Sequence, residues 1–301
     1  MHQGQKNVVW FNEVTKKDIP IAGGKGANLG EMANAHIPVP PGFIVTANAY
    51  YNFIKKSGIT DKILSLLKPL DYNNTKQLQQ IADQIKQVVL NATMPPKLAS
   101  EIQQAYRKMG EGLVAVRSSA TAEDLPEASF AGQQSTFLNV NGEKEVVAAV
   151  QACWASLFKP RAIFYRHQQG FDPFNVGIAV PIQRMVQSQA SGVMFTIEPM
   201  TSDQSKITIE AVYGLGEAIV SGQVETDLYI IDKEGLTISD KKIGKQDWEL
   251  IRNLAGGDDN TNIRVPLQPS RQTQQKLDDD DIIALAKIGK HIEDLYQFPK
   301  I

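Results

Sequence analysis

The sequence predicts a mixed fold of the α+β class, in which helices and strands occupy different stretches of the chain. Residues 60–109 and 282–296 repeat apolar side chains at helical spacing. Short apolar runs such as Leu113–Val116 and Ala190–Ile197 predict strands. The 301 residues, 42% of them hydrophobic, are enough for one large domain or for two lobes with a good core.

Charge, apolar runs and cysteine content argue against several classes of protein for this chain. The formal net charge of -2 gives no basic field for nucleic acid or an anionic membrane. No apolar run has the length of a membrane helix, and the N-terminus lacks the apolar core of a signal peptide. The single cysteine, Cys153, cannot form an intrachain disulfide and is expected to be buried. These features together predict a cytoplasmic protein.

The first ninety residues contain one segment that suggests chemistry. After a predicted strand at Val8–Phe11, Gly23 and Gly24 permit a tight turn into a helix that begins near Lys25. The segment is not a Walker A loop, because neither Ser nor Thr follows the lysine. A lysine at a helix start can bind an anion, or it can simply be exposed to solvent. Further along, Thr46 is expected to cap a helix that runs to Lys56.

The middle of the chain is predicted to be largely helical. Residues 60–109 divide into three helices, and Glu145–Leu157 and Arg161–Gln169 form two more. Trp154, Leu157 and Phe158 are expected in the core. His167 is interpreted as an ordinary helix residue.

Between these helical regions lies Leu113–Val140, the most informative stretch. Arg117 follows a predicted strand and precedes two serines, and a guanidinium there can bind phosphate or carboxylate oxygens. An acidic loop, Thr121–Glu127, comes next. Gly132 could then let backbone amides close over a phosphate chain before the strand Phe137–Val140. The alternative is a surface hairpin whose arginine forms an exposed ion pair.

The last part of the chain is predicted to be rich in strands. The runs at 176–184, 190–197, 206–212, 228–232 and 236–240 all have this pattern. Glu210 could accept hydrogen bonds from ribose hydroxyls or sit in a buried ion pair. The glycines of Gly214–Gly222 allow a sharp turn beside a ligand or a neighbouring strand.

The C-terminal residues are predicted to form a loop followed by a helix. Asn253–Ser270 is polar and is expected to be a flexible loop. Asp278–Asp281 is interpreted as an acidic helix N-terminus rather than as a metal site. The apolar residues expected to form a buried stripe on this helix are Ile282, Leu285, Ile288, Ile292 and Leu295.

Three segments resemble one family. They read VRSSATAEDLPEASFAGQQSTFLNV, GGKGANLGEM and IEAVYGLGEAIVSG. They are similar to the nucleotide-binding domain of the pyruvate, water dikinase (phosphoenolpyruvate synthase) family, and pyruvate, phosphate dikinases and rifampin phosphotransferases carry related versions. The resemblance implies an ATP-grasp-type domain whose first lobe covers about 1–182, whose hinge is 183–187 and whose second lobe covers about 188–301.

The same resemblance implies residue roles. Lys25 and Arg117 would neutralise charge on the ATP phosphates during catalysis. Residues 132–136 would form a lid, Gln183 and Met185 would lie nearest the adenine, and Glu210 would bind the ribose. The nucleotide contacts implied in this way are Gly132, Gln133, Gln134, Ser135, Thr136, Gln183, Met185 and Glu210.

Departures from the family pattern concern the end of the chain and its histidines. In the family, a magnesium-binding Asp/Glu pair follows where this chain reads Phe298–Ile301, so the domain is expected to be truncated at its C-terminus. Magnesium would then be a cofactor with ligands in a missing segment. Proline, common in the family near Glu225 or Thr226, is not present there. None of His2, His36, His167 and His291 lies in a phosphohistidine motif.

The predicted function follows from this comparison. A phosphohistidine domain and a pyruvate-binding domain would be partners in cis or in trans. The complete enzyme would transfer a phosphoryl group from ATP through a phosphohistidine to pyruvate, giving phosphoenolpyruvate, AMP and phosphate. The isolated chain is expected to bind ATP but to be impaired in catalysis. The alternatives are the ATP-binding module of a rifampin phosphotransferase and a non-catalytic nucleotide-binding module.

Overall fold

The computed structural model describes residues 6–121, 135–170, 172, 174, 176–253 and 262–299. Helices and antiparallel sheets both contribute, which confirms the predicted α+β class. The chain divides into two compact units, here the N-terminal unit (Met1–Met185) and the C-terminal unit (Val186–Ile301). The division falls inside the segment 183–187, whose role as a hinge stays a prediction.

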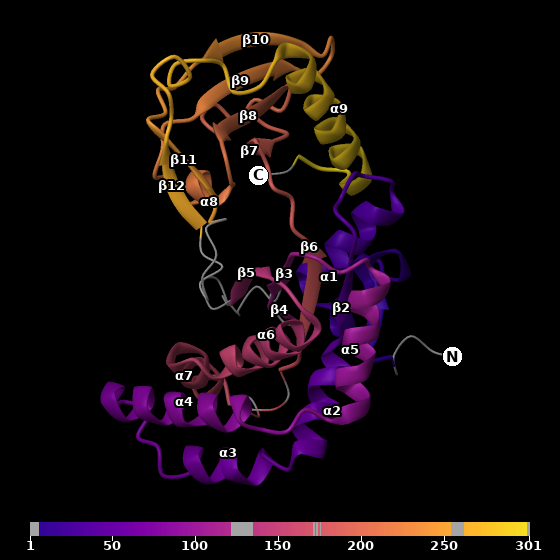
Figure 1. Ribbon diagram of the computed structural model, residues 1–301, viewed down its shortest axis with the longest axis vertical. Coiled ribbons are helices and arrows are strands. Elements are labelled where there is room, and N and C mark those ends of the chain that lie inside the picture. Colours follow the sequence, from indigo (N-terminus) through magenta and orange to yellow (C-terminus); the bar gives the residue numbers. More distant parts are fainter. Residues whose placement is uncertain are drawn as a thin grey trace. The chain divides into compact units, whose positions relative to one another are not determined.

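The N-terminal unit is built on one sheet with the strand order β1-β2-β6-β3-β5, in which β4 also pairs with β6. Strands β2–β6 of this sheet are labelled in Figure 1. All of these pairs are antiparallel. Its strands are β1 (Val8–Trp10), β2 (Gly42–Val45), β3 (Val114–Arg117), β4 (Ser119–Ala120), β5 (Thr136–Val140) and β6 (Ile178–Arg184). Its helices are α1 (Ile19–Asn34), α2 (Ala47–Ser57), α3 (Thr60–Leu67), α4 (Thr75–Leu90), α5 (Pro96–Lys108), α6 (Glu143–Ala155) and α7 (Pro160–Gln168).

The two faces of this sheet belong to different cores. Val114, Val116 and Ile182 point into the main core, which helices α2–α7 complete. Ile44 and Ala179 point to the opposite face, where α1 packs. Successive side chains of a strand alternate between the faces, so each strand contributes to both cores.

Helix boundaries in the N-terminal unit follow local chemistry. Thr46 accepts a hydrogen bond from the Ala49 amide, as its predicted capping role requires. The three helices predicted within 60–109 are α3, α4 and α5. Helix α1 begins earlier than expected, at Ile19, but Gly23 (φ 66°, ψ 166°) interrupts it. A new helical segment therefore starts next to Lys25, as the paired glycines predict.

The C-terminal unit contains a four-stranded antiparallel sheet, β10-β9-β8-β7, with α9 along it (Figure 1). Ile207, Tyr229 and Ile231 pack there against Ile282 and Ala286 of the helix. A separate ribbon joins β11 to β12. The elements of this unit are β7 (Ala190–Phe195), β8 (Lys206–Tyr213), α8 (Glu217–Val220), β9 (Asp227–Asp232), β10 (Thr237–Lys242), β11 (Trp248–Arg252), β12 (Asn262–Pro266) and α9 (Asp279–Tyr296).

Two expectations for the C-terminal unit need correction. Asn262–Pro266 is a strand paired with Trp248–Arg252, although the sequence predicts a loop there; residues 254–261 lie outside the described part. On α9 the buried positions are Ile282, Ala286 and Gly289, so most of the predicted stripe is only partly buried. The small residue Gly289 permits close packing on Met194, whose sulfur would lie 2.7 Å from an added Cβ.

Candidate functional site

Strand register places four residues of the N-terminal unit on one face of its sheet. Ala115 of β3 pairs with Gln183 of β6, and Arg117 of β3 pairs with Thr136 of β5. Residues two apart on a strand point to the same face, and so do directly paired residues. Arg117, Thr136 and Gln183 therefore lie on the face that α1 covers in part, opposite the main core. The structure thus brings together three residues that are far apart in the sequence.

Arg117 is a cation without a counter-charge among the described residues. It is partly buried, and this burial lowers the pKa of its guanidinium. Within the described ranges, its side chain has no hydrogen-bond or ion-pair partner. A partly desolvated guanidinium is stabilised by a charged acceptor such as phosphate or carboxylate. The surface ion pair considered from the sequence is not formed with any residue that the structure describes.

The segment of Lys25 is attached to the segment of Arg117 through Ser119. The Lys25 amide donates a hydrogen bond to Ser119 Oγ at 3.0 Å, across 94 residues of sequence. Gly23 makes this approach possible, because a Cβ at Gly23 would lie 2.3 Å from the same oxygen. Lys25 itself is exposed to solvent. The two motifs that sequence reasoning treated separately are therefore adjacent in the fold.

Ser118 forms a second link, towards the predicted lid. Its amide donates to the Ser135 carbonyl at 2.9 Å, and its Oγ accepts from the Ser135 amide at 2.8 Å. Thr136, the next residue, is exposed on the face that carries Arg117. The other lid residues implied by the resemblance, Gly132, Gln133 and Gln134, lie outside the described residues.

The residues predicted nearest the adenine are held by backbone contacts. Gln183 is buried, and its Nε2 donates to the Pro40 carbonyl at 3.1 Å. The Met185 amide donates to the Leu113 carbonyl at 2.9 Å. Because that amide is already bonded, it is not the donor that an adenine would need. An adenine beside Met185 would have to use its carbonyl or its side chain.

Glu210 belongs to the C-terminal unit. It lies on β8, and its carboxylate accepts a hydrogen bond from Thr226 Oγ1 at 3.0 Å. Among the described side chains, none forms an ion pair with Glu210, so the buried ion pair considered from the sequence is not formed there. The nearby Gly214 forms a bridge to Leu250, which makes the predicted sharp turn a contact with a neighbouring strand. Its φ of 82° suits glycine.

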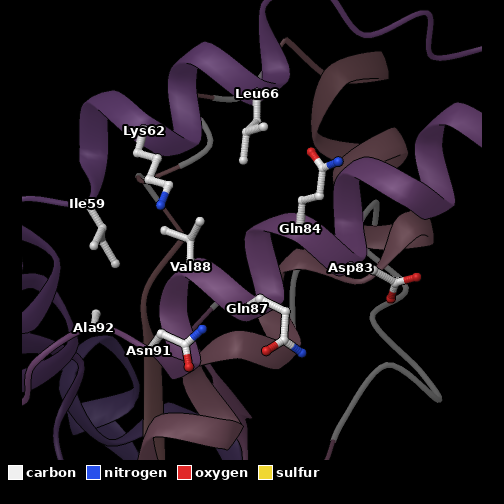
Figure 2. Close-up of a pocket in the computed structure, with 9 residues that line it drawn as sticks. All are labelled: Ile59, Lys62, Leu66, Asp83, Gln84, Gln87, Val88, Asn91 and Ala92. Carbon is white, nitrogen blue, oxygen red and sulfur yellow. The ribbon is translucent and has the colours of Figure 1, made fainter.

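A groove of about 600 Å³ lies between α3 and α4 in the N-terminal unit (Figure 2). Apolar and polar side chains both line it, among them Leu66, Val88, Lys62 and Asp83. None of the residues predicted to contact ATP takes part in it. This groove therefore does not account for the sequence motifs.

Other chemistry considered from the sequence has structural explanations. Asp278 caps α9, and its carboxylate accepts from the Asp281 amide at 2.9 Å. Across the described ranges, no group of three or more His, Cys, Asp or Glu side chains could hold a metal ion. In the same ranges, none of the helices combines the length and apolar character needed to cross a bilayer. Cys153 is fully buried, and this burial raises the pKa of its thiol.

Sequence reasoning missed three hydroxyl groups that organise these residues: Ser118, Ser119 and Thr226. Ser118 and Ser119 stand directly after Arg117, at the end of a predicted strand. Small hydroxyl residues at a strand end commonly bind backbone amides, and this was the available signal. Nothing in the sequence near Thr226 indicates its contact with Glu210, because the two residues meet only through strand pairing.

The arrangement in the N-terminal unit defines a candidate anion-binding domain, in which an arginine with no counter-charge among the described residues ends β3 and a glycine-rich lysine turn is bonded to Ser119. Residues 19–300 match the family described as pyruvate phosphate dikinase, AMP/ATP-binding domain. Because this match covers most of the chain, the chain belongs to that family. Nucleotide is thus the anion that the family description indicates.

Curated relatives carry related names. The chain is 48% identical over 300 residues to a probable phosphoenolpyruvate synthase of Methanocaldococcus jannaschii, covering 98% of this chain and 25% of that protein. It is 49% identical over 298 residues to a probable phosphoenolpyruvate synthase of Archaeoglobus fulgidus, covering 97% and 39%. It is 42% identical over 333 residues to the phosphoenolpyruvate synthase of Pyrococcus furiosus, covering 97% and 41%. The chain therefore spans about a quarter to two fifths of the length of these relatives.

Proposed function

We propose that the chain binds ATP in an ATP-grasp-type domain and serves as the nucleotide-binding part of a phosphoenolpyruvate-forming dikinase. The observation that carries this proposal is the partly buried Arg117, which has no counter-charge among the described residues and shares a sheet face with Thr136 and Gln183. The hydrogen bond from the Lys25 amide to Ser119 supports a common site for both cations. In this proposal, residues 183–187 connect two lobes, and Glu210 of the second lobe binds the ribose.

The proposed reaction joins ATP, pyruvate and water to give phosphoenolpyruvate, AMP and phosphate. A phosphoryl group passes first to a histidine of a phosphohistidine domain and then to pyruvate on a third domain, both in cis or in trans. Lys25 and Arg117 stabilise negative charge that develops on the phosphates, and fixed cations do this without reorganising at the moment of reaction. The lid at 132–136 excludes water.

Magnesium is the metal expected from the family resemblance, and it would offset the negative charge of the ATP phosphates. Among the described residues, no group of three or more His, Cys, Asp or Glu side chains could hold a metal ion. We therefore assign no magnesium ligand to these residues and derive no step through the ion. The charge of Lys25 and Arg117 is the part of the mechanism that this chain itself supplies.

Isothermal titration calorimetry with ATP, with and without magnesium, tests the proposal. Lys25→Ala and Arg117→Ala should each weaken binding by roughly 10- to 100-fold, the range for losing a hydrogen bond to a charged group. Lys62→Ala, a lysine of the groove between α3 and α4, is the matched control and should bind ATP like the unchanged chain. Equal affinity for ATP in Arg117→Ala and Lys62→Ala would overturn the role of Arg117.

Two alternatives remain as outcomes of activity measurements in a complete enzyme. The names of the relatives favour pyruvate as acceptor over a rifamycin. A non-catalytic nucleotide-binding module would bind ATP without turnover when the other domains are supplied. In a complete enzyme, Lys25→Ala and Arg117→Ala should each reduce phosphoryl transfer by orders of magnitude.

A further inference from the structure

The hydroxyl of Ser119 is the point at which the Lys25 segment meets the Arg117 segment. Ser119 is fully buried, and it lies on β4, where it pairs with Ala179 of the central strand β6. Its Oγ accepts the Lys25 amide at 3.0 Å. A hydroxyl held in this way by a strand has little freedom, so the amide that it binds is held equally firmly.

The backbone around Gly23 is shaped to fit this contact. Gly23 adopts φ 66° and ψ 166°, a conformation that side chains rarely allow. An added Cβ would lie 2.3 Å from Ser119 Oγ and 2.5 Å from the Ser119 carbonyl oxygen. The glycine-rich turn therefore passes directly over Ser119. The amide of Lys25, two residues after Gly23, then donates its hydrogen bond to the Ser119 hydroxyl.

Arg117 precedes Ser119 by two residues, so a shift of either segment moves one cation relative to the other. The adjacent Ser118 is bonded elsewhere, to the backbone of Ser135 at the start of β5. The two serines directly follow β3 and bind different segments of the chain, the strand β5 region through Ser118 and the lysine turn through Ser119. Ser119 is the one whose hydroxyl accepts the Lys25 amide.

We propose that Ser119 is a positioning residue, which fixes the backbone of Lys25 relative to Arg117 so that both cations reach the same phosphate chain. The inference rests on the proposed function, because it assumes that Lys25 and Arg117 bind phosphate. It adds that the hydroxyl of Ser119 touches neither nucleotide nor reacting atoms. Ser119 acts through Lys25 alone.

A double-mutant cycle on the 301-residue chain tests the inference, with ATP as the ligand in calorimetry. Ser119→Ala should weaken ATP binding by about tenfold, and it should have less than about a twofold effect when Lys25→Ala is already present. Additive effects of the two substitutions, or unchanged ATP binding in folded Ser119→Ala, would overturn the inference. If Lys25→Ala alone leaves ATP binding unchanged, the proposed function has failed instead.

Two further comparisons separate positioning from general damage. Adenosine lacks the phosphate chain, so its affinity should be the same for Ser119→Ala and the unchanged chain; a parallel loss for adenosine would contradict positioning. Thr46→Ala removes another buried hydroxyl of the N-terminal unit, the cap of α2. It should lower the melting temperature without changing ATP affinity.

If Ser119→Ala does not fold, Ser119→Cys takes its place in the double-mutant cycle. Cysteine keeps the size of the side chain but is only a weak acceptor, so it should give the same non-additive loss of ATP binding.

Discussion

Lys276 and Asp227 form an ion pair inside the C-terminal unit, with Lys276 Nζ 2.6 Å from Asp227 Oδ1 and both side chains fully buried. Asp227 also accepts hydrogen bonds from the amide of Gly244 at 3.0 Å, the amide of Lys276 at 2.8 Å and the hydroxyl of Tyr229 at 2.7 Å. Lys276 Nζ donates in addition to the Gly244 carbonyl. The pair therefore joins the start of β9, the segment after β10 and the segment before α9.

Breaking this pair should strongly destabilise the C-terminal unit. Asp227→Asn leaves the Lys276 ammonium buried without a counter-charge, and the expected loss in free energy of unfolding is about 3–5 kcal/mol. Urea denaturation followed by circular dichroism measures it. Asp247→Asn is the matched control, because its partner Lys245 lies at 2.8 Å with both side chains more than half exposed. That control should be almost neutral. Equal stability of the two variants would contradict the structural role of the buried pair.

Gly23 should tolerate no side chain, whereas Gly58 should tolerate one at moderate cost. Both have φ 66°, but an added Cβ at Gly58 meets nothing within 4 Å. Gly58→Ala should therefore lower the free energy of unfolding by only about 1 kcal/mol, because of backbone strain. Gly23→Ala adds the clash with Ser119 and should lower the free energy of unfolding by about 3 kcal/mol or more. Thermal or urea unfolding of both variants gives the comparison, and similar losses would show that the contact with Ser119 is not tight.

The thiol of Cys153 should be protected while the chain is folded. Burial raises its pKa in the folded state, so at pH 8 it should react with a thiol reagent far more slowly than a free thiol. Ser65→Cys, at an exposed position of α3, supplies the fast control in the same assay. Rapid modification of Cys153 without denaturant would contradict its burial.

The raised pKa of the Cys153 thiol also predicts how the stability of the folded chain changes with pH. An unfolded thiol loses its proton near pH 8.5, whereas the folded thiol keeps it at higher pH. The folded state therefore binds more protons above about pH 8.5, and this contribution to stability is lost as the pH rises further. Comparing the unchanged chain with Cys153→Ala between pH 8 and 10 isolates it. The unchanged chain should lose more stability over that range, and parallel losses would contradict the prediction.

Glu210 should discriminate ribose from deoxyribose if it binds the nucleotide sugar. Its carboxylate already accepts one hydrogen bond from Thr226, which fixes its orientation on β8. Glu210→Gln should weaken ATP binding more than binding of 2′-deoxy-ATP, by about five- to tenfold, the value of one hydrogen bond. Calorimetry with both nucleotides measures the ratio. Equal weakening for both would remove Glu210 from the sugar site.

Segments with a strong hydrophobic pattern were predictable, because the same residues that set the local structure are the ones that are buried. The helices α4 and α5 present apolar side chains at helical spacing, and β6 is an apolar run buried on both faces. Strand β12 was missed because it lies within a polar stretch and its residues are exposed or only partly buried, although polar and apolar residues alternate from Asn262 to Val265. It is a strand because β11 pairs with it along its whole length.

The candidate site was predictable as residue types but not as an arrangement. Lys25 and Arg117 stand out in glycine-rich or strand-end contexts, which local sequence can reveal. The bond from the Lys25 amide to Ser119 depends on β4 pairing with β6, a tertiary relationship that no local pattern encodes. The family resemblance supplied roles for residues, and the sheet register supplied the shared face of Arg117, Thr136 and Gln183.

The order of strands in the N-terminal unit has a consequence for synthesis on the ribosome. Strand β6 is the last strand of that unit to be made, yet it pairs with β2, β3 and β4. A nascent chain that has emerged only as far as Gly170 includes helices α1–α7 but lacks the strand that joins the two halves of the sheet. The pairing of β4 with β6, which holds Ser119 and through it the amide of Lys25, can therefore form only after Ala179 has left the exit tunnel.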